Sequence, residues 1–484
     1  MAQRLTKTIL PVLLSVACAT SGCSSLGDTV GDASASVFGG KRNGEVGYVA
    51  GFLGAVVADE PNAALAARDV LSAGGTAADA AVALGLALTV TLPSRAGLGG
   101  GGACLVFTPG AGVESVAFLP KAPGHAPPAA GPGARPAAVP MLARGLYALH
   151  ARYGDRTFAS LLGPAETLAR GGFAASRAFA RDLAVVAGPL AVDPAAQAVF
   201  FPGGKPVAEG TTLRQPGLAA TLVQLRQAGV GDLYQGALAH LLVAGAHDAG
   251  ASLTVEDLRT ALPEFSAPLT VPAGDNEVAF LAPPADGGLA TAASFQALQH
   301  DPAALAAAGA RGLAAAARFR RDGGDAAALL ASAALPEANL PPLPASTSFV
   351  TLDRKGNAVA CALTMNNLFG TGRVIAGTGI LLAASPAAQP RPLLSAAIAY
   401  RTGGRSFRAA VGASGQAAAP LAAALAMAQA LADTGSPAHP LPSPAPDPGR
   451  ANVIQCDGYL PGAEASCGWA TDPRGAGLAV GGSP

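Results

Sequence analysis

The spacing of apolar residues changes at a proline-rich stretch, residues 335–344, and this change constrains the fold more than any other feature. Before it, apolar residues follow mainly helical spacing, as in residues 142–153 and 158–169. After it, alternating runs joined by a glycine-containing turn predict a hairpin with strands at 348–352 and 358–364. Helix-rich and strand-rich stretches are interleaved without strict alternation, which favours a layered α+β fold over a doubly wound sheet.

Other elements are expected on both sides of this boundary. The patterns predict strands at 54–58, 103–107, 396–400 and 406–411, and helices at 61–73, 80–90, 217–227 and 417–432. A glycine-rich loop, residues 93–102, joins the second of these helices to the strand at 103–107.

Small side chains dominate the composition. The 484 residues include 62 glycines and 40 prolines, about 21% together and below the roughly 25–30% of low-complexity chains, while half of the residues are hydrophobic. We therefore expect a folded globular protein whose core depends on close backbone approach. The 31 basic and 31 acidic residues form no cationic run, which excludes an electrostatic footprint for nucleic acid.

The N-terminus has the layout of an export signal. Residues 1–23 contain two basic residues, a short apolar run and then small residues. Two interpretations remain open: simple cleavage after a small residue, or a lipoprotein signal in which Cys23, with Cys18 as the other candidate, is lipidated. Residues 24–45 are rich in glycine, serine and aspartate and predict a flexible tether. We expect an exported protein, periplasmic or lipid-anchored to a bacterial envelope, with no other membrane contact.

Export would place the remaining cysteines in an oxidising compartment. Cys456 and Cys467 flank a short loop and are predicted to form a disulfide. Cys104 and Cys361 lie in alternating apolar runs and are expected to be inert buried thiols. The sequence has no CxxC or HExxH motif and its six histidines are scattered, so we expect neither a metal site nor a cofactor.

Five stretches together resemble the gamma-glutamyltranspeptidase family in their order and spacing. They are residues 71–102, 231–258, 282–288, 346–372 and 470–481. The likeness extends from about residue 46 to residue 484. It implies the fold of the N-terminal-nucleophile hydrolases, a four-layer αββα sandwich. It also implies self-cleavage of one precursor into a large subunit, residues 46–345, and a small subunit, residues 346–484.

The resemblance places the cleaved bond between Ala345 and Ser346. Ser346 then stands where the family has a threonine nucleophile. An N-terminal serine supplies the same hydroxyl, and its own α-amino group, with a pKa near 7.7–8.0, can act as the base. Before cleavage the same hydroxyl would attack the Ala345 carbonyl, and the resulting ester would hydrolyse. The structural alternative is a polar turn that follows the proline-rich stretch.

The resemblance also implies roles for residues around the nucleophile. Thr364 corresponds to the threonine that hydrogen-bonds the nucleophile, and Asn366 to the asparagine that contacts the γ-glutamyl group. Gly415 and Gln416 stand where a glycine pair supplies backbone N–H groups to the oxyanion hole. As isolated features, Asn366 would be read as part of a solvated turn, and Gly415 and Gln416 as part of an ordinary strand-to-helix turn.

The positions that hold the charged end of the family's substrate are altered. Leu119 replaces the arginine that binds the α-carboxylate, and Ala387 replaces the acid that binds the α-amino group. In Leu394–Ser395 only one residue of a serine pair is kept. Lys121 is a candidate substitute for the arginine, although a solvated surface lysine is the alternative. Because an unpaired buried charge costs several kcal/mol, such a pocket is expected to reject the glutamyl zwitterion.

Three hypotheses about function follow. The first is an enzyme that cleaves itself before Ser346 and hydrolyses or transfers a γ-glutamyl or related acyl group through an ester on Ser346. The second is a non-catalytic relative that serves as an envelope or binding protein. The third is an amide acylase for an uncharged acyl group, similar to the cephalosporin acylases that share this fold. In both catalytic hypotheses the substrate is a small amide or peptide.

Overall fold

The computed structural model describes residues 43–125, 134–332, 335, 338, 340–432 and 445–482. The predicted signal segment with Cys23, and the predicted tether up to residue 42, lie outside the described residues. From Gly44 onward the chain forms one compact unit. Within the described ranges, no helix has the length and apolar character needed to cross a membrane.

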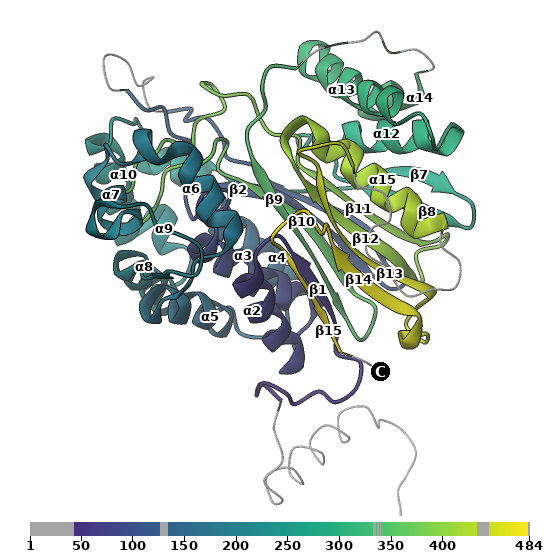
Figure 1. Ribbon diagram of the computed structural model, residues 1–484, viewed down its shortest axis with the longest axis horizontal. Coiled ribbons are helices and arrows are strands. Elements are labelled where there is room, and N and C mark those ends of the chain that lie inside the picture. The colour runs from purple at the N-terminus through teal and green to yellow at the C-terminus, as the bar shows by residue number, and fades with distance from the viewer. Residues whose placement is uncertain are drawn as a thin grey trace, which may run out of the picture. The chain divides into compact units, whose positions relative to one another are not determined.

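Two antiparallel sheets form the centre of this unit (Figure 1). The first has seven strands in the order β15 (Leu478–Gly481), β1 (Gly54–Ala58), β9 (Ser346–Asp353), β10 (Ala358–Thr364), β2 (Gly101–Thr108), β3 (Gly112–Phe118) and β6 (Glu264–Ser266). The second has six, in the order β14 (Cys467–Thr471), β13 (Arg450–Leu460), β12 (Phe407–Ser414), β11 (Ser395–Arg401), β8 (Asn276–Phe280) and β7 (Leu269–Ala273). A separate pair joins β4 (Phe173–Ala174) to β5 (Thr212–Leu213).

Helices cover the outer face of each sheet. On the first side lie α2 (Pro61–Ser72), α3 (Ala77–Thr91), α4 (Leu142–Tyr153), α5 (Phe158–Gly171), α6 (Arg177–Leu190), α7 (Pro194–Phe200), α8 (Pro216–Ala228), α9 (Asp232–Gln235), α10 (Ala237–Asp248) and α11 (Val255–Thr260). On the second side lie α12 (Gly287–His300), α13 (Leu305–Asp322), α14 (Ala326–Ala331) and α15 (Ala419–Ala432). Short 3₁₀ turns occur at η1 (Pro202–Gly204), η2 (Gln416–Ala418) and η3 (Glu464–Ser466).

Three buried apolar layers separate these elements. One lies between the first sheet and its helices, one between the second sheet and its helices, and one between the two sheets. The layer between the sheets consists of side chains such as Val57, Leu105, Ile398 and Ile454. The order helix, sheet, sheet, helix confirms the predicted four-layer αββα sandwich.

Helix α3 shows how the small side chains serve this fold. All fifteen of its residues are buried, which is expected of a helix that is apolar on every face. Gly85 allows close approach, because a Cβ there would lie 2.9 Å from a methyl carbon of Leu146 on α4. The helix begins with a capping box in which Thr76 and Asp79 bond each other's backbone amides.

The hairpin β9–β10 lies in the middle of the first sheet and carries the predicted nucleophile. Every residue of β9 is buried. At the far end of this strand, Asp353 accepts hydrogen bonds from the amides of Lys355 and Asn357 in the turn, and from the Ala77 amide at the start of α3. The turn is therefore tied to the covering helix, and Ser346, at the opposite end of β9, lies directly across from Thr364.

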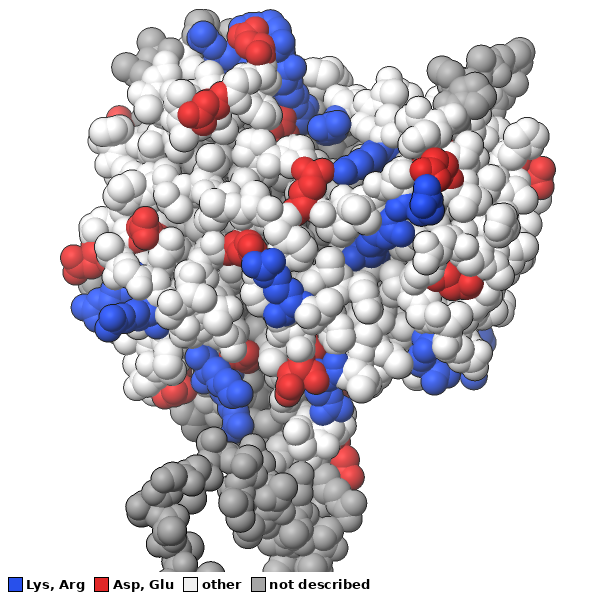
Figure 2. All heavy atoms as spheres, turned by 180° about the vertical axis from the view of Figure 1, so that it is seen from behind, with Lys and Arg blue, Asp and Glu red and all other residues white. Residues whose placement is uncertain are grey.

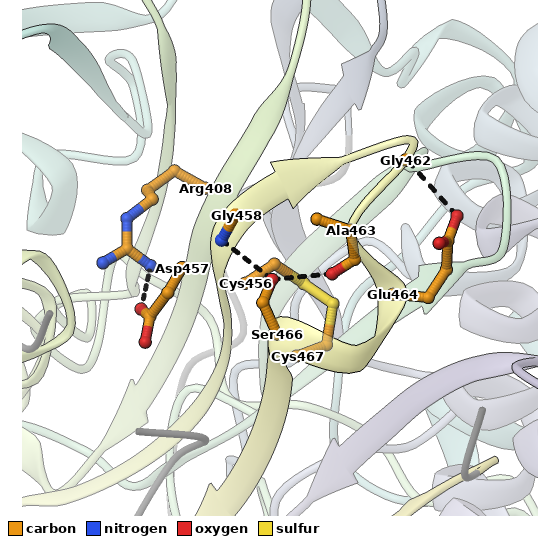
Figure 3. The surroundings of a disulfide bond; sticks show 9 residues. All are labelled: Arg408, Cys456, Asp457, Gly458, Gly462, Ala463, Glu464, Ser466 and Cys467. Carbon is orange, nitrogen blue, oxygen red and sulfur yellow. Dashed lines mark hydrogen bonds and ion pairs between the residues drawn. A yellow bond between two sulfur atoms is a disulfide. The ribbon is translucent and has the colours of Figure 1, made fainter. Parts of the chain in front are cut away.

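Two disulfides join cysteines within the described residues. One joins Cys456 to Cys467, the pair that flanks the predicted loop, and Figure 3 shows it beside a hydrogen bond from the Gly458 amide to Ser466 Oγ. The other joins Cys104 to Cys361, so the prediction of inert thiols was wrong. These two cysteines lie opposite each other in the pairing of β2 with β10, and a sequence separation of 257 residues conceals that proximity.

Candidate active site

A cavity of about 340 Å³ lies beside the peptide bond between Ala345 and Ser346, within the size range of small-molecule sites. Its walls come from α6, the segment between α3 and β2, the start of β9 and the turn between β12 and α15. Predicted site residues Ser346, Ala345, Gly415 and Gln416 all line it. The fold therefore brings together residues that are about 70 positions apart in the sequence.

A chain of hydrogen bonds ends on the Ala345 carbonyl. Thr364 Oγ1 donates to this oxygen at 3.0 Å and accepts from the Asn366 amide at 2.9 Å. Asn366 has a left-handed φ of 55° and its side-chain amide donates to the Ala384 carbonyl at 3.1 Å. The hydroxyl of Thr364 is thus oriented toward the carbonyl carbon that Ser346, itself only 1% exposed, would have to attack.

An ion pair forms the opposite wall. Arg95 donates from Nε and Nη2 to the two oxygens of Asp182 on α6, each at 2.7 Å, and from Nη1 to the Ser346 carbonyl at 3.4 Å. Ser94 Oγ adds a third hydrogen bond to Asp182 at 2.7 Å. Burial alone would lower the pKa of Arg95, but the adjacent Asp182 carboxylate raises it overall, so the guanidinium stays charged.

A second acid fixes the start of β9. Asp59 accepts from Thr347 Oγ1 at 3.1 Å and from the Ser348 amide at 3.0 Å. Its other oxygen accepts from the Asn452 side chain, at 2.8 Å. These bonds clamp the two residues that follow Ser346 and leave the Ser346 position at the end of a rigid strand.

The turn after β12 has a backbone conformation that favours glycine. Gly415 has a φ of 121°, and a Cβ there would lie 2.4 Å from the Pro448 carbonyl oxygen. Gln416 also has a left-handed φ, 56°, which a non-glycine residue rarely adopts. The backbone is thus in a conformation that two glycines would adopt with less strain, although the second residue is glutamine.

Three predicted substrate-binding residues do not line the cavity. The structure corrects the prediction for Lys121, because its ammonium pairs with Glu264 at 2.7 Å and donates to the Leu262 carbonyl. Strand β3 ends at Phe118, so the chain has left the sheet before it reaches this lysine. Ser395 is buried and its hydroxyl donates to the Leu393 carbonyl. Asn366 is buried behind Thr364.

The positions expected to have lost substrate contacts are also not among the residues that line the cavity. Leu119 and Leu394 belong to the apolar layer between the two sheets. Ala387 lies two residues after Ser385, whose hydroxyl accepts from the Ala387 amide. The side chains that line the cavity are therefore not the ones on which the sequence argument about substrate charge depended.

Arg95, Asp182 and Asp59 were not predicted from the sequence as site residues. A signal existed in the composition, because only 13% of the residues are charged and an arginine in the glycine-rich loop at 93–102 is conspicuous. Figure 2 shows charged side chains scattered over a mostly uncharged face of the molecule. Among the described residues, no group of three or more His, Cys, Asp or Glu side chains is placed to hold a metal ion.

Comparison with solved structures establishes the class of fold. The crystal structure of cephalosporin acylase from Bacillus halodurans superposes with a TM-score of 0.72 over 89% of this chain and 96% of that chain, at 21% sequence identity. The four-layer fold of this chain is thus shared with that acylase. A family model for gamma-glutamyltranspeptidase matches residues 63–319, just over half of the chain. The chain belongs to the gamma-glutamyltranspeptidase family.

Curated relatives cover part of the sequence. The glutathione hydrolase proenzyme of Escherichia coli (strain K12) is 27% identical over 379 residues, which are 68% of this chain and 65% of that protein. The acylase ACY 1 proenzyme of Pseudomonas sp. (strain SE83) is 34% identical over 211 residues, 40% of this chain and 38% of that protein. The chain thus spans less than two thirds of the length of these relatives.

Proposed function

We propose that this chain is a self-processing amide hydrolase or acyltransferase that is cut between Ala345 and Ser346 and then uses Ser346 as its nucleophile. The observation that carries the proposal is the hydrogen bond from Thr364 Oγ1 to the Ala345 carbonyl, at a serine that opens a rigid central strand beside a cavity. A polar turn would not need a buried donor oriented by the Asn366 amide.

In self-cleavage, Ser346 Oγ attacks the Ala345 carbonyl carbon and negative charge develops on the carbonyl oxygen. Thr364 Oγ1 donates to that oxygen and stabilises it. The C–N bond then breaks, the Ser346 nitrogen takes the proton that Oγ has lost, and an ester links Ala345 to Ser346 Oγ. Water hydrolyses the ester, leaving a carboxylate on Ala345 and a free α-amino group on Ser346.

In turnover, the free α-amino group takes the hydroxyl proton while Ser346 Oγ attacks the substrate amide carbonyl. The backbone N–H groups at Gly415 and Gln416 line the same cavity and are candidates to stabilise the new oxyanion. The amine product leaves with a proton. Water or an acceptor amine then takes the acyl group from the ester on Ser346 and restores the hydroxyl.

A second candidate, an amide acylase that does not accept γ-glutamyl groups, is supported by the likeness of this chain to the acylase ACY 1 proenzyme. Hydrolysis rates for γ-glutamyl-p-nitroanilide and a neutral acyl anilide distinguish the candidates. A clear preference for the glutamyl compound would contradict the acylase.

The cleavage is tested by denaturing electrophoresis under reducing conditions. We expect the purified protein to release a fragment of 139 residues, 346–484, and Ser346→Ala to remain one chain. Ser348→Ala, which removes a hydroxyl two residues along the same strand, should still be cut. Failure of the unaltered protein to be cut, or cutting of Ser346→Ala, would overturn the proposal.

A further inference from the structure

A second and larger cavity, of about 1370 Å³, lies between the second sheet and its helices. Its walls come from α12, the start of α13, the end of α15, the turn between β7 and β8, and strands β12 and β13, and we call it the α15 cavity. Among the described residues, none lines both this cavity and the one beside Ser346. Arg408 and Ser414, near opposite ends of β12, line one cavity each, about 20 Å apart at the usual rise of a strand.

The walls of the α15 cavity are mostly apolar and reach into the core. Phe295 and Leu298 of α12 are 1% and 2% exposed, and Leu425 of α15 belongs to the same buried layer beside the second sheet. Sites of this kind bind molecules with an apolar body, and a few polar groups decide which molecules fit. The hydrogen bonds of the polar side chains in the lining therefore indicate the class of ligand.

The buried charges of this cavity cancel within the described part of the chain. Arg408, 5% exposed, pairs with Asp457 at 2.6 Å (Figure 3), and it also donates to the Ala430 carbonyl at 3.0 Å. Asp275 lines the cavity too, but it is exposed in the turn between β7 and β8, where an ion pair with a ligand would contribute little. The cavity therefore favours an uncharged ligand over an ionic one.

One buried polar group in the lining has no partner. The Tyr459 hydroxyl donates to Asn276 Oδ1, and the Gln299 side-chain amide donates to the Pro272 carbonyl, each at 2.9 Å. By contrast, Gln429 Oε1 is buried and accepts no hydrogen bond, and the Gln429 side-chain nitrogen donates none, among the described residues. Because an unsatisfied buried polar group is costly, a ligand that supplies its partner gains affinity.

We propose that the α15 cavity binds an uncharged small molecule whose apolar part packs against α12 and α15 and whose amide group pairs with the Gln429 side chain. An amide carries a donor and an acceptor side by side, so it supplies both hydrogen bonds that Gln429 lacks, whichever way this side chain is turned. An ester of the same shape supplies only an acceptor. This site is separate from Ser346 and does not depend on self-cleavage.

Calorimetric titration with two matched probes tests the site. The probe 4-phenylbutanamide has an apolar body and a primary amide, whereas methyl 4-phenylbutanoate has a similar shape but no donor. Both are titrated into the unaltered protein and into Ser346→Ala, in which the proposed hydrolysis cannot contribute heat. We expect the amide to bind about tenfold more tightly than the ester in both proteins. Equal affinities, or no binding of the amide at millimolar concentration, would overturn the proposal.

Gln429→Leu removes the side-chain amide while keeping a side chain of similar size. It should weaken binding of the amide probe about tenfold and leave binding of the ester nearly unchanged. Gln227→Leu, at an exposed glutamine of α8 outside the cavity lining, is the matched control and should change neither affinity. Unchanged binding of the amide to Gln429→Leu would refute the pairing.

Filling the cavity gives a test that does not depend on Gln429. Ala428→Trp places a large side chain in the cavity wall and should abolish binding of both probes. Ala307→Trp, at an exposed position of α13 outside the lining, is its control and should bind both probes normally. Denaturant unfolding establishes that each variant is folded. Binding that persists in folded Ala428→Trp would place the probes elsewhere, for example beside Ser346, and would also overturn the proposal.

Discussion

Single side chains around Ser346, the proposed nucleophile, each hydrogen-bond to more than one part of the chain. Arg95 joins the segment before β2 to α6 and to the carbonyl of Ser346, and Asp59 holds the next two residues of β9 to Asn452. Two hydrogen bonds fix the orientation of the Thr364 hydroxyl, which donates to the Ala345 carbonyl and accepts from the Asn366 amide. Its role in the proposed chemistry can be isolated without altering the shape of the side chain.

Thr364→Val should fold normally but cleave itself about 100-fold more slowly, because a donor to the developing oxyanion is lost. The measurement is a time course of fragment release after synthesis, resolved by reducing electrophoresis. Thr89→Val is the control, since Thr89 is buried and its hydroxyl donates to the Leu86 carbonyl within α3. An unchanged cleavage rate in Thr364→Val would contradict the assigned role.

Gly415→Ala should destabilise the protein by about 3 kcal/mol and suppress turnover, because its Cβ meets a backbone oxygen that cannot move aside. Gly377→Ala is the matched control, with a positive φ of 78° but no atom within 4 Å of the added carbon. It should cost about 1 kcal/mol and leave turnover intact. Denaturant unfolding gives both values, and equal losses would show that strain in the dihedral angle, and not the contact, decides the effect.

At this scale the sequence indicated the segment of the proposed nucleophile but not its surroundings. Ser346, Thr364 and Gly415 were found because they belong to stretches that resemble a family. Arg181 and Asp182 lie in a helix whose pattern is ordinary, and nothing local marks two adjacent residues of α6 as neighbours of Ser346. Only the folded chain brings them to the cavity beside the start of β9.

At the scale of elements, short helices depend on single polar residues. Helix α11 begins with a capping box in which Thr254 and Asp257 bond each other's backbone amides. The same Asp257 carboxylate accepts hydrogen bonds from the amides of Gly124 and His125 and so holds a distant segment against the helix. Burial opposes ionisation, but hydrogen bonds from Thr254, His125 and Gly124 lower the pKa of Asp257 below its ordinary value.

Asp257→Ala should therefore reduce the free energy of unfolding by about 1–2 kcal/mol at pH 7. Because the folded-state pKa is lowered, this contribution is present above about pH 4 and is lost as the pH falls through the folded pKa. The difference between the unaltered protein and the variant should shrink accordingly in denaturant titrations below pH 4. A difference that stays constant to pH 3 would contradict the linkage, and Asp248→Ala, with a carboxylate 87% exposed, provides the control.

Elements with strong periodicity were predicted well, and those stabilised by their neighbours were not. The predicted hairpin at 348–364 and the helices at 142–153 and 158–169 correspond to β9–β10, α4 and α5. The long strand β13 was not predicted, because its segment had been interpreted through the loop between Cys456 and Cys467. Strands β7 and β14 are sheet edges of five residues each, and pairing rather than pattern fixes them.

At the scale of the whole molecule, the proposed cut divides the sheets between two pieces. The first sheet contains β1, β2, β3 and β6 from one side of residue 345 and β9, β10 and β15 from the other. The Cys104–Cys361 disulfide joins β2 to β10 and therefore crosses this division. The cysteine pair at 456 and 467 lies wholly within the second piece.

This arrangement predicts a particular electrophoretic pattern. After cleavage, the two pieces should migrate together under denaturing conditions without reductant and separate when reductant is added. Cys104→Ala should separate under both conditions, whereas Cys456→Ala should behave like the unaltered protein. Two separate bands from the unaltered protein without reductant would show that this disulfide does not form.

The same disulfide bears on how such an enzyme would respond to dilution. Two subunits held only by contacts obey an association equilibrium, so their activity per molecule falls once they are diluted below the dissociation constant. Subunits joined between β2 and β10 cannot part or exchange with those of another molecule. As long as this disulfide is intact, the two pieces of one precursor would stay together however dilute the solution.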